Sequence, residues 1–207
     1  MSWDEHAAGW DEDVAVRAYS QAAFQSLRTL CQERQISLHG ARVLDFGCGT
    51  GLLTEQLSPL CEEIVAIDSS AKMIEVLREK VQQRRLTNVR SSAVAIHAAT
   101  VEEVPLLAEP FDLVVCSSVC AFLDDYPGSA QLLAGLLSPG GLFVQWDWEL
   151  SPDADEPFGL TREQIQRALS AAGLVSVQVQ TAFEVPVAGE VMSPLLGAGQ
   201  APGYTGL

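Results

Sequence analysis

Short apolar runs alternate with helical patterns along most of the chain. Five of these runs are rich in Val, Ile, Leu and Phe, so each predicts a buried strand. They cover residues 42–46, 64–67, 94–96, 111–116 and 142–146. Apolar residues at helical spacing predict helices over 52–60, 71–84 and 129–137. Continuous apolar strands that alternate with helices predict a parallel sheet covered on both faces.

Both ends of the chain extend this pattern. A partial apolar stripe predicts a helix over 13–32. Ser-Pro-Gly-Gly at 138–141 predicts a helix stop and a tight turn before the fifth strand. Thr161 and the residues after it resemble a capping box, so a helix should begin there and stop at Gly173.

Two further strands are expected near the C-terminus. Valines alternate with polar residues in the stretch 174–184, which predicts a strand. A last strand near 192–199 has a weaker signal, because Pro194 cannot donate to an interior ladder. Without repeats or a long linker, the chain is expected to form one α/β domain over 1–207.

Composition and charge limit the classes of partner that the protein can bind. The chain has 207 residues, with 48% hydrophobic and 19% charged residues, which are values of a folded domain. Its 27 acidic and 12 basic residues give a net charge of −15, which disfavours nucleic acid and anionic membrane as partners. The densest basic stretch, 78–90, has no interleaved aromatic residues and is interpreted as a solvated helix face.

The cysteines and the N-terminus suggest a location. Five cysteines form an odd set without metal-type spacing, so we expect reduced thiols, no metal site and a cytoplasmic protein. The first residues lack the basic and apolar regions of a signal peptide. No apolar run reaches the roughly 18 residues that a membrane span needs, so a soluble protein is expected.

A glycine-rich segment follows the first predicted strand. The strand ends near Asp45, and Gly47, Gly49 and Gly51 come before the next helix. Glycines let a ligand approach the backbone closely, and the following helix directs free N–H groups at that point. Asp68 ends the next strand, where its carboxylate can accept both hydroxyls of a ribose. This pattern indicates a nucleotide-type site.

A dinucleotide dehydrogenase would have a similar loop, but two residues disfavour it. Its G-x-G-x-x-G/A pattern, counted from Gly47, needs Gly or Ala at position 52, where this chain has Leu52. Asp45 would also repel a pyrophosphate, whereas it suits the amino group of an amino-acid ligand.

Four motifs carry a more specific resemblance. Val-Leu-Asp-Phe-Gly-Cys-Gly-Thr-Gly at 43–51 resembles the first motif of class I S-adenosylmethionine-dependent methyltransferases. Segments 64–74, 111–118 and 137–144 are similar to the later motifs of this family, in the same order and spacing. The resemblance implies a Rossmann-like fold: a seven-stranded, mostly parallel sheet with helices on both faces and the last strand antiparallel. It also implies a lid over 1–40, a cofactor-binding core over 41–149 and a C-terminal helix with the last strands over 150–207.

The resemblance further implies roles for individual residues. The glycine loop should pass the methionine part of S-adenosylmethionine, with Asp45 engaging its ammonium group and Asp68 holding the ribose. Thr100 stands where the family has an acid, which leaves recognition of the adenine open between its hydroxyl and the Val101 amide. The full set of expected cofactor residues is Asp45, Gly47, Cys48, Gly49, Asp68, Ser69, Met73, Thr100, Val101, Cys116 and Ser117.

The acceptor is not determined by the sequence. The family's Asn-Pro-Pro-Tyr signature for amide or base nitrogens is absent, and Ala121 and Phe122 offer no base after the fourth strand. The candidate proton acceptors are His6, Tyr19 and Asp147, with Glu149 beside the last of these. The structural alternatives are a surface position for His6, a helix position with a solvated hydroxyl for Tyr19, and side chains that point outward for Asp147 and Glu149. Four tryptophans, Trp3, Trp10, Trp146 and Trp148, are candidates for an aromatic acceptor pocket, with core packing as the alternative for Trp146.

The resemblance therefore predicts a methyltransferase that acts on a small molecule, with a protein side chain as the alternative acceptor. A partner subunit that binds the cofactor without turnover is an alternative, because proton acceptors are few. An NAD-dependent reductase is a weaker alternative. The atom that is methylated and the oligomeric state stay open.

Overall fold

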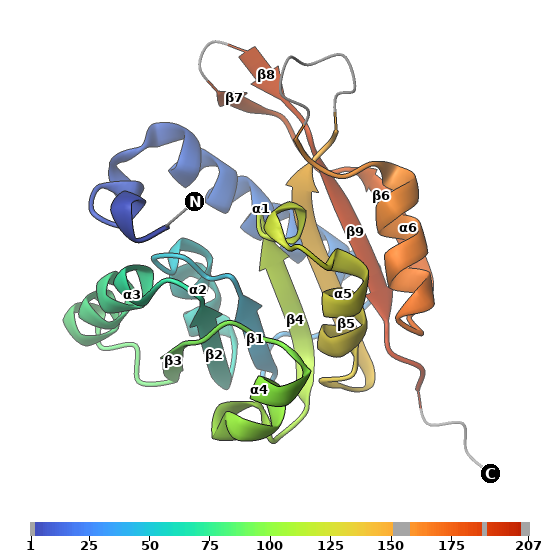
Figure 1. The fold of residues 1–207 in the computed structure, drawn as a ribbon, viewed down its shortest axis with the longest axis horizontal. Coiled ribbons are helices and arrows are strands. Elements are labelled where there is room, and N and C mark those ends of the chain that lie inside the picture. The colour runs from blue at the N-terminus through green and yellow to red at the C-terminus, as the bar shows by residue number, and fades with distance from the viewer. Residues whose placement is uncertain (1–2, 151–157, 188–189, 204–207) are drawn as a thin grey trace.

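The structure is a computed structural model that describes residues 3–150, 158–187 and 190–203. Its main sheet has seven strands (Figure 1). They are β1 (Arg42–Phe46), β2 (Glu63–Asp68), β3 (Val89–Ala93), β4 (Phe111–Ser117), β5 (Leu137–Trp148), β6 (Val175–Thr181) and β9 (Pro194–Gln200). Their order is β3-β2-β1-β4-β5-β9-β6, and β9 runs antiparallel to the other six strands. The predicted seven-stranded, mostly parallel sheet is confirmed.

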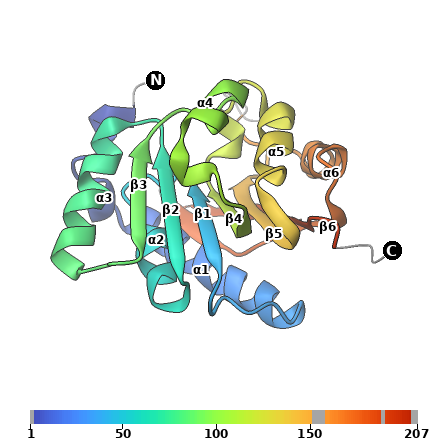
Figure 2. The ribbon, with the colours of Figure 1, turned by 90° about the horizontal axis from the view of Figure 1, so that it is seen from below.

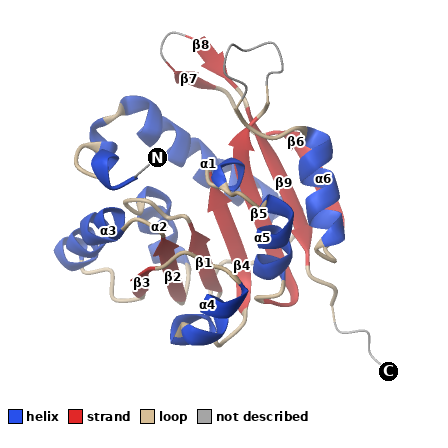
Figure 3. Cartoon of the chain, in the orientation of Figure 1, coloured by secondary structure: helices blue, strands red, loops and turns tan. Residues whose placement is uncertain are grey.

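Helices cover both faces of the sheet (Figure 2). The α-helices are α1 (Val14–Glu33), α2 (Leu52–Leu57), α3 (Ala71–Arg84), α4 (Ala98–Glu103), α5 (Tyr126–Ala134) and α6 (Arg162–Ala171). Short 3₁₀ helices are η1 (Trp3–His6), η2 (Trp10–Glu12), η3 (Ser58–Leu60), η4 (Pro105–Leu107) and η5 (Cys120–Phe122). Figure 3 shows how helices and strands alternate through the core. No helix in the described ranges is both long enough and apolar enough to cross a bilayer.

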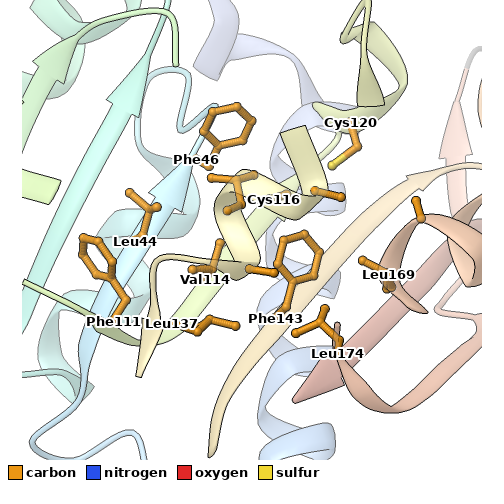
Figure 4. Close-up of a cluster of buried hydrophobic side chains, with 14 of the residues drawn as sticks. Leu44, Phe46, Phe111, Val114, Cys116, Cys120, Leu137, Phe143, Leu169 and Leu174 are labelled. Atoms are coloured by element: carbon orange, nitrogen blue, oxygen red, sulfur yellow. The ribbon is translucent and has the colours of Figure 1, made fainter. Parts of the chain in front are cut away.

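Alternation along each strand divides the core into two layers. On β1, Val43 packs with the buried residues of α1 and α2, while Leu44 packs on the opposite face with those of α5 and α6. In Figure 4, Phe143 lies near the centre of this second layer and Phe111 at its edge, near Leu44. Both faces of the central strands are therefore buried, which explains their continuous apolar sequences.

The third strand lies earlier in the chain than predicted. It is β3, whereas the apolar run at 94–96 follows it and is not part of the strand. β3 lies at the edge of the sheet and alternates buried Val89 with exposed Arg90, so its sequence lacks an apolar run. Helix α5 also begins earlier, at Tyr126, because Asp125 caps it by accepting the Gly128 N–H at 2.9 Å.

The Ser-Pro-Gly-Gly segment is a bulge within β5 and does not precede it. Phe111 pairs with Leu137 and Leu113 pairs with Leu142, so residues 138–141 form the extra length. Gly140 has a φ of +81°, which glycine adopts without steric cost.

The C-terminal strands meet the predictions in part. The α6 capping box is present, since the Thr161 hydroxyl accepts the Gln164 N–H at 3.1 Å and the Gln164 side chain accepts the Thr161 N–H. β9 lies inside the sheet between β5 and β6. Pro194 is tolerated there because it is the first residue of the strand, next to Trp148 at the end of β5. A hairpin of β7 (Val185–Val187) and β8 (Glu190–Met192) was not predicted.

Candidate cofactor and acceptor site

A cavity of about 510 Å³ lies where β1, β2, β4 and β5 end. Asp45, Asp68, Ser117 and Trp148, at or near the carboxyl ends of these four strands, all line it. The order of the strands reverses between β1 and β4, and ligands of doubly wound sheets bind at such a point. In Figure 1 the N-terminal segment lies above this end of β1 and β2.

The three glycines of the loop are required for different reasons. A Cβ on Gly47 would lie 2.4 Å from a methyl carbon of Val119, and one on Gly51 would lie 2.3 Å from a methyl carbon of Leu77. A Cβ on Gly49 would meet nothing nearer than the Trp10 indole nitrogen, at 3.9 Å. Gly47 and Gly51 therefore permit packing within the protein, whereas Gly49 leaves its side of the cavity open. All three have positive φ.

Asp68 fixes the shape of this loop. Its carboxylate accepts the Gly49 N–H at 2.9 Å and the Ser70 N–H at 2.8 Å. Burial raises the pKa of Asp68 above its ordinary value, and these N–H donors oppose that effect. Each carboxylate oxygen retains further lone pairs for ligand hydroxyls.

Asp45 is almost completely buried beside the glycine loop. Its carboxylate accepts the Thr54 hydroxyl at 2.5 Å. Burial raises the pKa of Asp45 to about 6, the Thr54 hydrogen bond lowers it, and the nearby Asp68 charge raises it. A buried carboxylate with so little compensation is stabilised by a bound cation.

The wall beyond Asp68 differs from the predicted one. Ser69 and the buried Met73 line the cavity. The Val101 amide donates to the His97 carbonyl at 3.2 Å at the start of α4, and the Val101 side chain packs on the core. The side chain of Thr100 lies outside the described residues. The apolar run at 94–96 lines the cavity instead. Its sequence is typical of a strand, so this position was not predicted.

The end of β4 contributes through its loop. Ser117 lines the cavity, whereas Cys116 is fully buried in the core layer and does not. Cys48 lines the cavity, and burial raises the pKa of its thiol well above the ordinary value. Ser118 also lines the cavity, with a φ of +56°. It was not predicted, because no local sequence signal marks a strained residue in a loop.

Tyr19 reaches the cavity from α1, far from the glycine loop in sequence. Its hydroxyl donates to the Trp146 carbonyl at 3.0 Å, and burial raises its pKa well above the ordinary value. Its ring lies 5.1 Å from that of Trp148 and 5.3 Å from that of Phe183. Tyr19 therefore forms an aromatic wall of the cavity. Because its hydroxyl stays protonated and donates to a carbonyl, it cannot act as a general base.

The other candidate proton acceptors do not line the cavity. Asp147 is buried, where it accepts the Ala121 N–H at 3.0 Å and the Gln145 amide at 2.9 Å. Burial raises the pKa of Asp147 to about 7. His6 is exposed on η1, and Glu149 pairs with Arg162 at 3.0 Å. No three His, Cys, Asp or Glu side chains in the described part of the chain are grouped to hold a metal ion.

The tryptophans divide between site and core. Trp3, Trp10 and Trp148 line the cavity. Trp146 is fully buried, and its indole N–H donates to the Ser26 hydroxyl at 3.1 Å. The structural alternative for Trp146 is therefore the one observed.

Polar contacts tie the N-terminal segment across the glycine loop. Asp11 accepts the Thr50 hydroxyl at 2.5 Å and forms an ion pair with Lys80. Asp4 accepts the Ser70 hydroxyl at 2.5 Å. The acidic and aromatic composition of the first residues was visible in the sequence, but the partners of those residues were not.

The fold and site define a doubly wound α/β protein with a nucleoside-type cofactor site. The family described as "Methyltransferase domain" matches residues 44–145. An uncharacterized methyltransferase of Schizosaccharomyces pombe is 37% identical over 109 residues, which is 51% of this chain and 38% of that protein. A ubiquinone biosynthesis O-methyltransferase of Coxiella burnetii is 32% identical over 109 residues, or 53% of this chain and 44% of that protein.

A solved structure is similar over most of the chain. It is the N-methyltransferase NodS of Bradyrhizobium japonicum in complex with S-adenosyl-L-homocysteine, with a TM-score of 0.68 and 20% identity over 93% of this chain and 90% of that one. The chain matches the methyltransferase-domain family over residues 44–145, which is just under half of its 207 residues. It spans less than half the length of the two curated relatives named above.

Proposed function

We propose that this protein is an S-adenosylmethionine-dependent methyltransferase that acts on a small-molecule acceptor. The observation that carries the proposal is the pair of carboxylates, Asp45 and Asp68, on either side of an open glycine loop in one cavity. One carboxylate is suited to an ammonium group and the other to ribose hydroxyls. The match of residues 44–145 to the methyltransferase-domain family supports the same cofactor.

The residues present fit this cofactor. Asp45 is buried with a raised pKa, so a bound ammonium supplies the counter-charge that it lacks. Gly49 leaves room at the loop, and Asp68 has lone pairs left for hydroxyls. Apolar residues 94–96 and Met73 offer a surface for an adenine ring. The proposed set also keeps Gly47, Cys48, Ser69 and Ser117, which line the same cavity.

The bound cofactor supplies a methyl group on a sulfonium, which an acceptor lone pair takes while the C–S electrons return to sulfur. The protein has to align the acceptor and exclude water. Trp3 and Trp10 of the N-terminal segment lie over the cavity, and Asp4 and Asp11 hold that segment to the loop. We propose that residues 1–40 act as the lid that excludes water.

A cytoplasmic location is part of the proposal. It is supported by the five cysteines, all of which are free thiols.

Calorimetry with the purified chain tests the cofactor. We expect S-adenosylhomocysteine to bind with a Kd in the micromolar range, about −8 kcal/mol, and NADH to give no binding heat. Binding of NADH without S-adenosylhomocysteine would replace the proposal with the reductase alternative.

A non-catalytic partner subunit is the second candidate. The observation that favours it is the lack of an available base among the candidates: the Tyr19 hydroxyl donates to the Trp146 carbonyl, and Asp147 is buried in the core. This alternative predicts cofactor binding without turnover of any acceptor, together with co-purification of a second chain. Turnover by the isolated chain would exclude it.

A further inference from the structure

The cavity has two chemically different ends. The cofactor end, over β1 and β2, carries Asp45, the glycine loop and Asp68. The lining residues that come from the start of α1, the loop after β4 and the end of β5 form what we call the acceptor end: Asp13, Val16, Tyr19, Phe122, Asp124 and Trp148. β4 separates β1 from β5, so Trp148 at the end of β5 lies away from the strands that carry the cofactor residues. A ligand held over β1 and β2 leaves this end for a second molecule.

Aromatic rings form much of the acceptor end. Tyr19 and Trp148 lie 5.1 Å apart, and Phe183 supports Tyr19 from behind at 5.3 Å. At the rim, Phe122 is 42% exposed and lies 4.8 Å from Trp3 and 4.6 Å from Phe158. Rings arranged in this way favour a flat apolar ligand, and their faces also attract a cation.

The charge of the acceptor end has one sign. Asp13 and Asp124 are exposed acids that line it, and no Lys, Arg or His of the described residues lines any part of the cavity. The stretches outside the described ranges, 1–2, 151–157, 188–189 and 204–207, contain none of these residue types in their sequence. Nearby Lys80 and Arg17 are both bonded to Asp11. A carboxylate or phosphate on the acceptor would therefore lack a counter-charge here.

The chemistry available at this end points to nitrogen. A phenol or thiol must lose a proton before it is a good nucleophile, and the resulting anion would be repelled by the acids. An amine that binds as its ammonium form passes one proton to one of the acids or to water and becomes neutral. Its lone pair then forms the new N–C bond while the C–S electrons stay on sulfur. The ammonium that results releases one proton to water or to a carboxylate, and until then the acids and ring faces stabilise it.

We propose that the acceptor end binds a flat apolar amine as the methyl acceptor. This inference rests on the proposed methyltransferase function and names its substrate class.

Three indole compounds of similar size test the inference by binding, without relying on turnover. They are tryptamine (cationic), tryptophol (neutral) and indole-3-propionate (anionic), titrated calorimetrically into the protein saturated with S-adenosylhomocysteine. We expect tryptamine to bind at least tenfold more tightly than indole-3-propionate, with tryptophol between them. Equal affinities, or tighter binding of the anion, would overturn the inference.

Variants that neutralise the two acids test whether these side chains cause the preference for the amine. Asp13→Asn combined with Asp124→Asn should reduce the ratio of the two affinities to less than threefold. Asn also caps helices, so the first change keeps the α1 cap, in which Asp13 accepts the Ala15 N–H at 2.7 Å. The control is Asp125→Asn, which removes a neighbouring exposed acid that does not line the cavity and should leave the ratio unchanged. A ratio that the double variant does not change would contradict the assignment.

Failure of the two proposals can be told apart. If S-adenosylhomocysteine does not bind, the proposed function is wrong. If it binds and the indole series shows no preference for the amine, only the substrate class is wrong.

Discussion

The two ends of the cavity are built by different means. At the cofactor end the two carboxylates and the glycine loop lie within one segment of chain, Asp45 to Asp68, although Met73 and residues 94–96 also line it. The main chain has a large part there, since Gly49 leaves space and its N–H donates to Asp68. At the acceptor end the determinants are side chains from α1, η5 and β5, which are more than 100 residues apart at their extremes, as with Tyr19 and Trp148.

This difference has consequences for tolerance to change. A loop whose shape depends on positive φ and backbone hydrogen bonds permits few substitutions, because each one strains the chain or fills the site. A wall of side chains can change one residue at a time while the fold stays intact. We therefore expect the largest effects of mutation at the cofactor end and smaller, ligand-specific effects at the acceptor end.

Gly49→Val should have the largest effect. Its side chain would project toward the open side of the loop, near Trp10, and we expect at least a hundredfold loss of S-adenosylhomocysteine affinity in calorimetry. Gly40→Val is the matched control, because Gly40 also has positive φ, has no neighbour within 4 Å and does not line the cavity. The control should share the backbone strain but retain binding. Normal binding by a folded Gly49 variant would refute the loop assignment.

Asp68→Ala should lower the same affinity by at least tenfold, about 1.4 kcal/mol. The change removes the acceptor for ligand hydroxyls and for the Gly49 and Ser70 N–H groups. Comparison with Asp68→Asn separates these effects, since Asn keeps one oxygen for the loop. If Asp68→Ala binds S-adenosylhomocysteine as tightly as the parent protein does, Asp68 has no ribose role.

The pH dependence of stability tests the role of buried Asp147, which holds the loop that carries Phe122. Folding raises the pKa of Asp147 to about 7, so the folded state binds this proton more tightly than the unfolded chain. The contribution of Asp147 to stability is therefore fully present below about pH 4 and is lost as pH rises to about 7. We expect the melting temperature to fall between pH 5 and pH 8, and to fall less in Asp147→Asn.

Two features make this measurement specific. In Asp147→Asn the side-chain oxygen can still accept the Ala121 N–H, so the loop that carries Phe122 keeps its anchor. Part of the decrease should remain, because Asp45 has a pKa raised to about 6 by the same cause. An identical decrease in parent and variant would show that Asp147 is ionised without cost.

Tyr19→Phe should have the smallest effect. The Trp146 carbonyl loses the hydroxyl donor at 3.0 Å, and we expect about 1 kcal/mol of destabilisation in urea unfolding. The ring contacts with Trp148 and Phe183 remain, so S-adenosylhomocysteine affinity should stay within twofold. A large loss of turnover at unchanged stability would restore Tyr19 as a catalytic candidate. That result would also weaken the contrast between the two ends.

Some of these features could be predicted from the sequence because their causes are local. β1, the glycine loop and Asp68 follow from one short segment, and the α6 capping box from four residues. β3 was placed wrongly because an edge strand is covered on one side and lacks the apolar run of a central strand. The prediction of β9 was weak because a proline is rarely found in an interior strand. Pro194 is tolerated only because it is the first residue of that strand.

By itself, the sequence determined the alternation of strands and helices, the cofactor loop with its two carboxylates, and the negative charge. These features depend on the order and type of neighbouring residues, which a single chain displays directly. The tertiary structure decided which tryptophans line the cavity, that Asp147 is sealed beneath it, and that the acceptor end has acids but no cation among the described residues. Such features depend on contacts between residues that are far apart in sequence, and these contacts form only when the helices pack on the sheet.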